Sequence, residues 1–379
     1  MAEIHGTCDD RFESVRNALA KNLDSGDELG ASIVLDLDGD IVIDMWGGFR
    51  DQEQTVPWDE HTITNVWSST KTVTSLAALT LVERGQLDVD APVARYWPQF
   101  AANGKEGVLV RHLMSHSSGV SGLEQPAKVE DLYDWEQSTS RFASQAPWWE
   151  PGTASGYHAL NFGHLIGEVV RRVSGKSLKQ FVAEEIAGPL GADFQIGAVE
   201  SDWGRIADVV PPPPLPIDMS EIDTNSPAFK TFTGPAPAGE DANTPGWRGA
   251  DIGAANGHTN ARGIARVMSV VARGGEVDGV RLLSPETIDL IFREQSNGTD
   301  LVVGVPIRFG IGYGITMPEL FMPQDDKICF WGGWGGSIIL MDVSRRMTFA
   351  YMMNKMGAGI LGSDRGFEYQ QAVFAALGS

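Results

Sequence analysis

Apolar segments with the length of β-strands lie at the two ends of this chain, while helical patterns fill its middle. Residues 31–37 and 41–46 form one such pair, joined by Asp38-Gly39-Asp40, a typical hairpin turn. Further strand patterns cover residues 308–315, 328–331, 336–341 and 348–353. We expect the strands of both ends to pair in a single antiparallel sheet. The sequence therefore predicts an α/β (α+β) fold, in which this sheet is flanked by helices and accompanied by a mostly helical lobe.

Helical periodicity indicates how the chain divides. Apolar residues recur at helical spacing over 11–23, 68–85, 161–173, 259–274 and 368–377, and shorter helices are expected at 110–114 and from Ser284. The 379 residues exceed the usual size of a single domain. We expect a discontinuous α/β domain made of residues 1–75, 113–170 and 270–379, and a helical domain made of residues 76–112 and 171–269. The cleft between the two is the expected place of a functional site.

A proline-rich segment interrupts the helical part. Residues 209–245 include four consecutive prolines, Pro211 to Pro214. Because proline lacks a backbone donor and cannot sit inside a helix or a central strand, this segment is predicted to be irregular. Segments that carry candidate catalytic residues flank it, so we expect a loop that shapes a pocket.

Charge and terminal sequence restrict the partners and the location. Lys and Arg total 29 against 50 Asp and Glu, which gives a net charge of −21. Such a field repels nucleic acids and anionic membranes, so neither is expected as a partner. The N-terminus lacks the basic start and apolar run of a secretory signal, and no apolar stretch reaches the roughly 18 residues of a membrane span. We expect a cytoplasmic protein with reduced cysteines at Cys8 and Cys329, and the sequence does not indicate its oligomeric state.

Ser68 precedes Lys71 by three residues at the start of an apolar helical pattern. Residues three apart on a helix share a face, so the hydroxyl and the amine can meet. An amine beside a hydroxyl can remove its proton if burial keeps the amine neutral. The pair therefore indicates a serine nucleophile with its base one turn away. The alternative is a solvated first turn of a helix.

Tyr157 is the candidate for a second proton carrier. A phenol has a pKa near 10, and an adjacent ammonium group would favour its phenolate form. Lys71 and Tyr157 would then share a proton and titrate as a unit. Taken alone, the same residue could be a half-buried core tyrosine.

A glycine-rich stretch, Trp331-Gly332-Gly333-Trp334-Gly335-Gly336-Ser337, interrupts an apolar strand pattern. Four glycines weaken a strand, but they allow a substrate to approach the backbone. An amide of this stretch could therefore join the Ser68 amide in an oxyanion hole. The alternative is a bulge or a tight bend.

Taken together, these segments resemble the serine β-lactamase and penicillin-binding-protein superfamily, most closely class C β-lactamase-like hydrolases and family VIII carboxylesterases. Residues 81–93, residues 110–120, Pro151-Gly152 and residues 255–258 match the family pattern in order. The resemblance implies a β-lactamase/DD-peptidase-like fold with Ser68 as the acylated nucleophile. It also implies Lys71 and Tyr157 as its proton partners, and the N–H groups of Ser68 and Trp334 as the oxyanion hole. No cofactor or metal is implied.

Two positions depart from the pattern. Ala159 stands where many relatives have an asparagine that contacts a β-lactam side chain, and Trp331-Gly332-Gly333 replaces a Lys-Thr-Gly or His-x-Gly motif. Trp331 offers a flat apolar wall instead of a cation, and with Gly332 and Gly333 it is predicted to contact substrate. Both changes disfavour β-lactams and peptidoglycan.

Other candidates are less specific. Trp148 and Trp149 could line the acyl pocket or pack between the two domains. His112 and His116 have the spacing of metal ligands on a helix, but without a nearby carboxylate they are predicted to be structural.

The sequence thus predicts a serine carboxylesterase that cleaves small uncharged esters through an acyl-enzyme. Three alternatives stay open: an acyltransferase to an alcohol or amine, an amidase or weak β-lactamase, and a binding module whose catalytic site has decayed.

Overall fold

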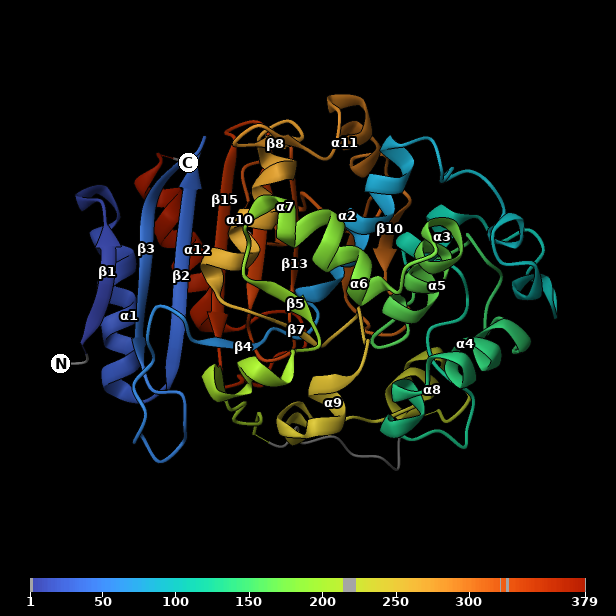
Figure 1. The fold of residues 1–379 in the computed structure, drawn as a ribbon, viewed down its shortest axis with the longest axis horizontal. Coiled ribbons are helices and arrows are strands. Elements are labelled where there is room, and N and C mark those ends of the chain that lie inside the picture. The colour runs from blue at the N-terminus through green and yellow to red at the C-terminus, as the bar shows by residue number, and fades with distance from the viewer. Residues whose placement is uncertain (1–2, 214–222, 321, 325–326, 379) are drawn as a thin grey trace.

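The centre of the structure is a nine-stranded antiparallel sheet that uses both ends of the chain (Figure 1). The computed structural model describes residues 3–213, 223–320, 322–324 and 327–378. In spatial order the strands are β1 (Ile4–Cys8), β3 (Asp40–Gly48), β2 (Gly30–Leu37), β15 (Met347–Met353), β14 (Ile338–Asp342), β13 (Ile328–Gly332), β12 (Gly314–Ile315), β11 (Pro306–Phe309) and β10 (Ser296–Thr299).

The junction between the two ends is the pairing of β2 with β15. It runs in antiparallel register from Ala31 opposite Met353 to Leu37 opposite Met347. β15 is buried along its whole length, and so is nearly all of β2. A strand buried on both faces needs cover on both sides of the sheet. The predicted antiparallel sheet of N- and C-terminal strands is therefore confirmed.

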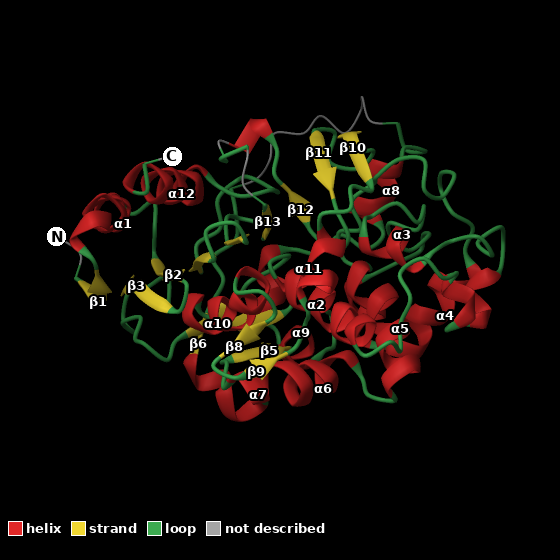
Figure 2. Ribbon diagram, turned by 90° about the horizontal axis from the view of Figure 1, so that it is seen from above, coloured by secondary structure: helices red, strands yellow, loops and turns green. Residues whose placement is uncertain are grey.

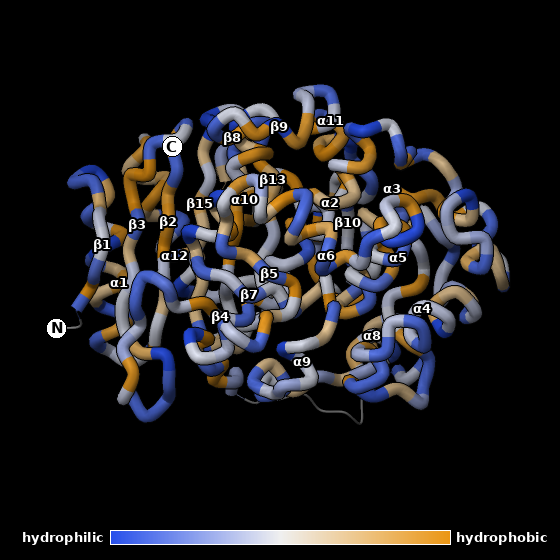
Figure 3. Tube along the Cα trace, viewed as in Figure 1, coloured by the Kyte–Doolittle hydropathy of each residue, from blue (hydrophilic) through white to orange (hydrophobic). Residues whose placement is uncertain are grey.

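Helices supply this cover on both faces (Figure 2). On one side, α1 (Glu13–Ser25) and α12 (Asp364–Ala376) pack against the sheet with a core that includes Phe12, Leu19 and Tyr369. On the other side, α10 (Ala261–Ala272) lies over β2, β15 and β14, and α2 (Thr70–Glu83) lies near β13. Hydrophobic segments follow these inner strands and α10, whereas many of the outer loops are hydrophilic (Figure 3).

The middle of the chain forms a mainly helical region around α2. Its helices are α3 (Val110–Met114), α4 (Trp135–Ser144), α5 (Phe162–Ser174), α6 (Leu178–Val182), α7 (Gly188–Leu190), α8 (Pro227–Thr233) and α9 (Pro245–Gly249), and α11 (Pro285–Ile291) follows α10. A four-stranded sheet joins β5 (Phe194–Ile196), β7 (Gly257–Thr259), β4 (Ile63–Asn65) and β6 (Ile206–Ala207), and β8 (Glu276–Val277) pairs with β9 (Val280–Arg281). The domain boundary expected after residue 75 falls inside α2, so the division into two domains stays a prediction.

Several predicted elements differ in detail. The strand expected over residues 308–315 is two strands, β11 and β12, because the chain turns at Gly312 with a φ of +88°. β1 was not predicted, since its sequence lacks an apolar alternation. The proline-rich segment is less irregular than expected: Pro227 and Pro245 each begin a short helix, where proline's fixed φ suits the first turn. Residues 214–222 of that segment lie outside the described residues.

Other predictions concern the cysteines and the membrane. Cys8 and Cys329 are both free, as expected. Among the described residues, no helix combines the length and the apolar character needed to cross a bilayer.

A buried ion pair ties the two ends of the chain together beside the sheet. Arg365 of α12 donates to Glu28 Oε1 at 2.9 Å and to the Lys355 carbonyl at 2.7 Å, and Glu28 also accepts the Tyr351 hydroxyl. Burial raises the pKa of Glu28 to about 7, and the Arg365 guanidinium opposes that shift. The pair fixes the start of the loop that runs from Asn354 to Ser363 between β15 and α12.

Removing one partner of this pair should be costly. We predict that Arg365→Met lowers the free energy of unfolding by about 3–5 kcal/mol, because it leaves a carboxyl buried without its cation. The double variant Glu28→Gln/Arg365→Met should recover part of this loss, since the remaining side chain is uncharged. Urea unfolding of the three proteins at pH 8 measures the effect. Equal stability of the single variant and the wild type would contradict it.

Candidate active site

Ser68 lies in the short turn between β4 and the first residue of α2. The residue before it, Trp67, has a φ of +48°, a left-handed conformation that is rare for a bulky side chain. Its indole packs against Trp247 and Trp334, with ring centroids 5.4 and 5.0 Å away. Such strained backbone persists only where its surroundings hold it, and it is concentrated at functional sites.

Backbone contacts from the start of β7 and the segment that leads into it hold this turn. The Val66 amide donates to the Gly257 carbonyl at 2.9 Å, and the Gly257 amide donates to Thr70 Oγ1 at 2.8 Å. Asn256 orders that segment from within: its side chain accepts from the Ile252 amide and donates to the carbonyls of Trp247 and Ala250. The match noted at residues 255–258 therefore has a structural reason, since this segment braces the nucleophile turn.

Lys71 is buried, and its Nζ lies 2.8 Å from Ser68 Oγ. Two backbone carbonyls complete its surroundings, Ala159 O at 2.7 Å and Ala254 O at 2.9 Å. Burial lowers the pKa of Lys71 well below its usual value, because desolvation disfavours the ammonium form.

The three neighbours of Nζ decide what a neutral Lys71 does. A neutral amine has two N–H groups and one lone pair. Carbonyl oxygens only accept, so the two N–H groups point to Ala159 and Ala254, and the lone pair faces the Ser68 hydroxyl. This is the arrangement of a general base that is ready to take the Ser68 proton.

Tyr157 closes the other side of Lys71, whose Nζ lies 4.8 Å from the centroid of the tyrosine ring. Its hydroxyl accepts a hydrogen bond from Trp331 Nε1 at 3.2 Å and also interacts with the Ser68 side chain. Two distant segments thus bring a hydroxyl, an amine and a phenol together, as the sequence predicted.

The protonation of this pair follows from its burial. Burial raises the pKa of Tyr157 well above its usual value, and the hydrogen bonds from Ser68 and Trp331 offset only part of that shift. Burial also lowers the pKa of Lys71. The resting site therefore favours a neutral amine beside a neutral phenol, so the proton that the two groups were predicted to share lies on Tyr157.

The loop that carries Tyr157 is held by the buried carboxylate of Asp300, directly after β10. Asp300 Oδ1 accepts the backbone N–H groups of Tyr157, Val302 and Val303 at 2.9–3.0 Å. The Ser155 carbonyl accepts from the Leu301 amide in the same contact. Asp300 is thus a positioning residue for Tyr157.

His116 and His158 pack behind Tyr157. The His116 ring centroid lies 5.0 Å from that of Tyr157, and its Nδ1 accepts the His158 amide at 3.0 Å. Burial lowers the pKa of both imidazoles, that of His158 to about 3, so both are neutral. His112 Nδ1 accepts the Leu109 amide at the start of α3. These contacts are structural, as expected for His112 and His116.

The turn between β13 and β14 packs against the nucleophile turn. Ser337 Oγ donates to the Val66 carbonyl at 2.9 Å and lies 3.0 Å from Ser69 Oγ. Gly333 fits between the two turns because a β-carbon there would lie 2.5 Å from the Val66 carbonyl oxygen. The glycines of this stretch thus permit a close approach of two backbone segments, which brings Trp334 against Trp67, the residue before Ser68.

Within the described part of the chain, the backbone N–H groups of Ser68 and Trp334 donate to no protein acceptor, whereas those of Gly333, Gly335 and Gly336 each do. Two unused donors beside a nucleophile are what an oxyanion hole requires. The assignment of Ser68 and Trp334 to that role remains a prediction that this geometry supports.

The predicted substrate-contact residues fall into two groups. Trp331 and Gly332 border an apolar cavity, and the Trp331 ring packs against Tyr157 with centroids 5.3 Å apart. Trp149 packs behind Tyr157, where its indole covers Gly156 and donates to the Ala154 carbonyl at 3.0 Å. Trp148 packs near Gly122, under the ammonium of Lys230. Neither Trp148 nor Trp149 lines the cavity beside Trp331.

Sequence reasoning missed Asp300, the structural role of Asn256 and the two carbonyls that hold Lys71. Asp300 carried a turn signal, since an aspartate often accepts N–H groups two or three residues onward. Its contact with Tyr157 and the carbonyl contacts of Lys71 have no sequence signal, because every residue has a backbone.

Comparisons with known proteins identify the family of this chain. The sequence model of the family described as Beta-lactamase matches residues 15–371. The chain belongs to the β-lactamase family. Esterase/beta-lactamase LipL of Mycobacterium tuberculosis is 33% identical over 372 residues, which are 95% of this chain and 85% of LipL.

Solved structures of this family extend the likeness to the whole fold. A family VIII carboxylesterase superposes with a TM-score of 0.92 at 39% identity, covering 99% of this chain and all of that one. A penicillin-binding-protein homologue from Caulobacter crescentus superposes with a TM-score of 0.91 at 36% identity, with the same coverage. These relatives place the chain among esterase- and β-lactamase-like serine hydrolases and confirm the resemblance seen in its motifs.

In the described part of the chain, no three His, Cys, Asp or Glu side chains are grouped to hold a metal ion.

A buried neutral lysine has a signature in stability. In the unfolded chain Lys71 is protonated below about pH 10, whereas the folded protein holds it neutral down to its lowered pKa. Between these two pKa values the unfolded state binds one more proton, so stability rises with pH. We predict that the unfolding free energy of the wild type, relative to Lys71→Met, increases by about 1.4 kcal/mol per pH unit between pH 8 and 9.5. Urea titrations at three pH values measure this slope, and parallel curves would contradict a neutral Lys71.

Proposed function

We propose that this protein hydrolyses uncharged carboxylic esters through an acyl-enzyme formed on Ser68. The observation that carries the proposal is the pair of buried groups at the start of α2, where Lys71 Nζ lies 2.8 Å from Ser68 Oγ with both of its N–H groups used by carbonyls. A lysine held in this way can act as a base at neutral pH, which an exposed lysine cannot.

In the first step, Lys71 takes the Ser68 proton while Oγ attacks the ester carbonyl. The carbonyl oxygen becomes an oxyanion, which the N–H groups of Ser68 and Trp334 stabilise. Lys71 is now an ammonium, and its three hydrogens are directed to Ala159 O, Ala254 O and the reacting centre.

In the second step, the bond between the carbonyl carbon and the alcohol oxygen breaks. The Tyr157 hydroxyl gives its proton to the departing alkoxide and regains one from the Lys71 ammonium. The raised pKa of Tyr157 keeps the proton on the phenol until the alkoxide, a stronger base, develops. The acyl group stays on Ser68.

Water completes the cycle. It loses a proton to the neutral Lys71, attacks the acyl carbonyl and releases the acid, while Ser68 recovers its hydrogen through the same residues in reverse.

The surroundings of Tyr157 favour an uncharged substrate, because Trp331 places an indole where a cation would be needed to bind a carboxylate.

Removing the nucleophile tests the proposal directly. We predict that Ser68→Ala loses at least 1,000-fold in turnover of p-nitrophenyl butyrate, in the range found when triad members of serine hydrolases are removed. Circular dichroism and the melting temperature should stay close to those of the wild type, because Ser68 lies at a turn and its hydroxyl is the only group removed. Intact-mass measurement of a trapped wild-type intermediate should show one acyl adduct. Full activity of Ser68→Ala would end the proposal.

The role of Tyr157 is tested by the leaving group. We predict that Tyr157→Phe loses about 100-fold or more on ethyl butyrate, whose alkoxide needs a proton to depart. It should lose much less on p-nitrophenyl butyrate, whose phenolate departs without one. His112→Gln, which changes a buried polar side chain of a neighbouring helix, is the control. Equal losses on both esters would show that Tyr157 acts by position alone.

A further inference from the structure

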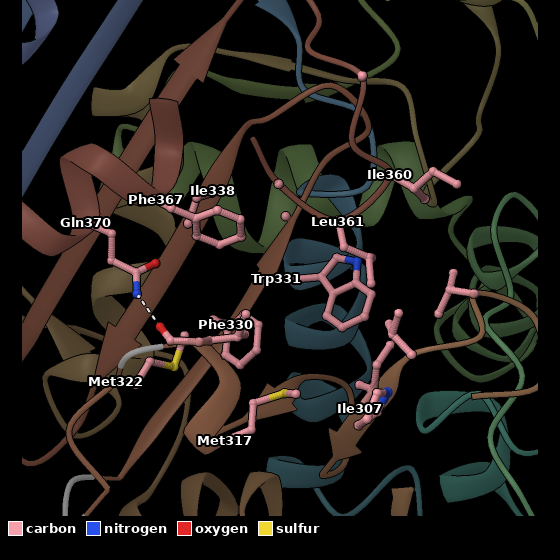
Figure 4. Close-up of a pocket in the computed structure, with 17 residues that line it drawn as sticks. Ile307, Met317, Met322, Phe330, Trp331, Ile338, Ile360, Leu361, Phe367 and Gln370 are labelled. Carbon is pink, nitrogen blue, oxygen red and sulfur yellow. Dashed lines mark hydrogen bonds between the residues drawn. The ribbon is translucent and has the colours of Figure 1, made fainter. Parts of the chain in front are cut away.

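An apolar cavity of about 510 Å³ is bordered by Trp331, whose indole also packs against Tyr157 (Figure 4). Its walls come from β11, β13, the loop after β15 and α12, and include Ile307, Phe330, Leu361 and Phe367. Gln370 is a polar side chain of the wall, and its amide already donates to the Leu320 carbonyl at 3.2 Å. The cavity thus suits a hydrocarbon chain better than a polar ligand.

Trp331 joins the cavity to the catalytic side chains. One side of the indole contacts the Tyr157 ring, and its Nε1 donates to the Tyr157 hydroxyl at 3.2 Å. The same indole, together with Ile307, also lines the cavity, and all three residues belong to one hydrophobic cluster. A group bound at the Tyr157 hydroxyl therefore has apolar space within reach around Trp331.

We propose that this cavity receives the alcohol part of the ester and that the enzyme prefers esters of medium-chain primary alcohols. The inference rests on the proposed function. Tyr157 must reach the oxygen of the leaving alcohol, whereas the N–H groups of Ser68 and Trp334 hold the carbonyl oxygen. The chain attached to the leaving oxygen therefore starts at Tyr157, against which Trp331 of the cavity wall packs.

The mouth of the cavity has an apolar rim on the loop between β10 and β11. Val305 lines the cavity and is 45% exposed, and Val303 lines it while partly buried. Leu301, on the same loop, is also exposed but does not line the cavity. The loop thus offers a position that would narrow the cavity and a matched position that would not.

Two isomeric esters separate the alcohol side from the acyl side. Hexyl acetate and ethyl hexanoate have the same atoms, but the long chain belongs to the alcohol in the first and to the acid in the second. Each methylene group that enters the cavity should raise kcat/KM by about two- to fourfold. We expect the wild type to prefer hexyl acetate by at least tenfold.

Val303→Trp should fill the cavity mouth, and Leu301→Trp is its control. We expect the ratio of kcat/KM for hexyl acetate to that for ethyl hexanoate to fall at least tenfold in Val303→Trp and to stay within twofold in Leu301→Trp. The ratio cancels any loss of folded enzyme. An unchanged or raised ratio in Val303→Trp, or the same fall in both variants, would overturn the proposal.

Failure of the proposed function is recognised separately, because the wild type would then cleave neither ester. The cavity is still testable in that case by calorimetric titration with 1-hexanol. Binding that is lost in Val303→Trp and kept in Leu301→Trp supports an alcohol site. Binding that is absent from the wild type, or equal in all three proteins, overturns it.

Discussion

The burial of one amine organises this site. Lys71 sits at the first turn of α2, a helix that is buried along most of its length, with its Nζ among a hydroxyl and two carbonyls in place of a carboxylate. The carbonyls come from segments far apart in the chain, residues 159 and 254. Both segments must therefore pack closely on α2 before Lys71 is desolvated. The lowered pKa of Lys71 therefore depends on the packing of the helical region against the sheet.

How much of this could be predicted depends on how local the signal is. Ser68 and Lys71 are three residues apart on a helix, so sequence spacing alone places them together. β2, β15 and α10 were predictable because their apolar patterns are long. β1, a short strand with three exposed residues, has no such pattern. The hold of Asp300 on the Tyr157 amide spans 143 residues and uses a backbone group, so no pattern in the sequence could indicate it.

Protonation could not be predicted either, for a physical reason. From the sequence, Lys71 and Tyr157 are two groups that could share one proton, and the sequence does not say which of them holds it. The structure buries both, and the loss of hydration lowers the pKa of Lys71 and raises that of Tyr157. The aromatic and imidazole rings around them, such as His116 and Trp331, add bulk without charge. Burial is a property of the assembled fold, which explains why residue types alone could not place the proton.

The pairing of β2 with β15 also has a consequence for folding during synthesis on the ribosome. About 300 residues of chain separate these two strands, yet each is a central neighbour of the other. A ribosome adds roughly 5–20 residues per second, so β2 waits on the order of 15–60 s for its partner to be translated. During that time an apolar strand has an open edge, the kind of surface that chaperones shield. The nascent chain cannot complete this sheet segment by segment in the order of synthesis, because residues 347–353 must be made before residues 31–37 gain their partner strand.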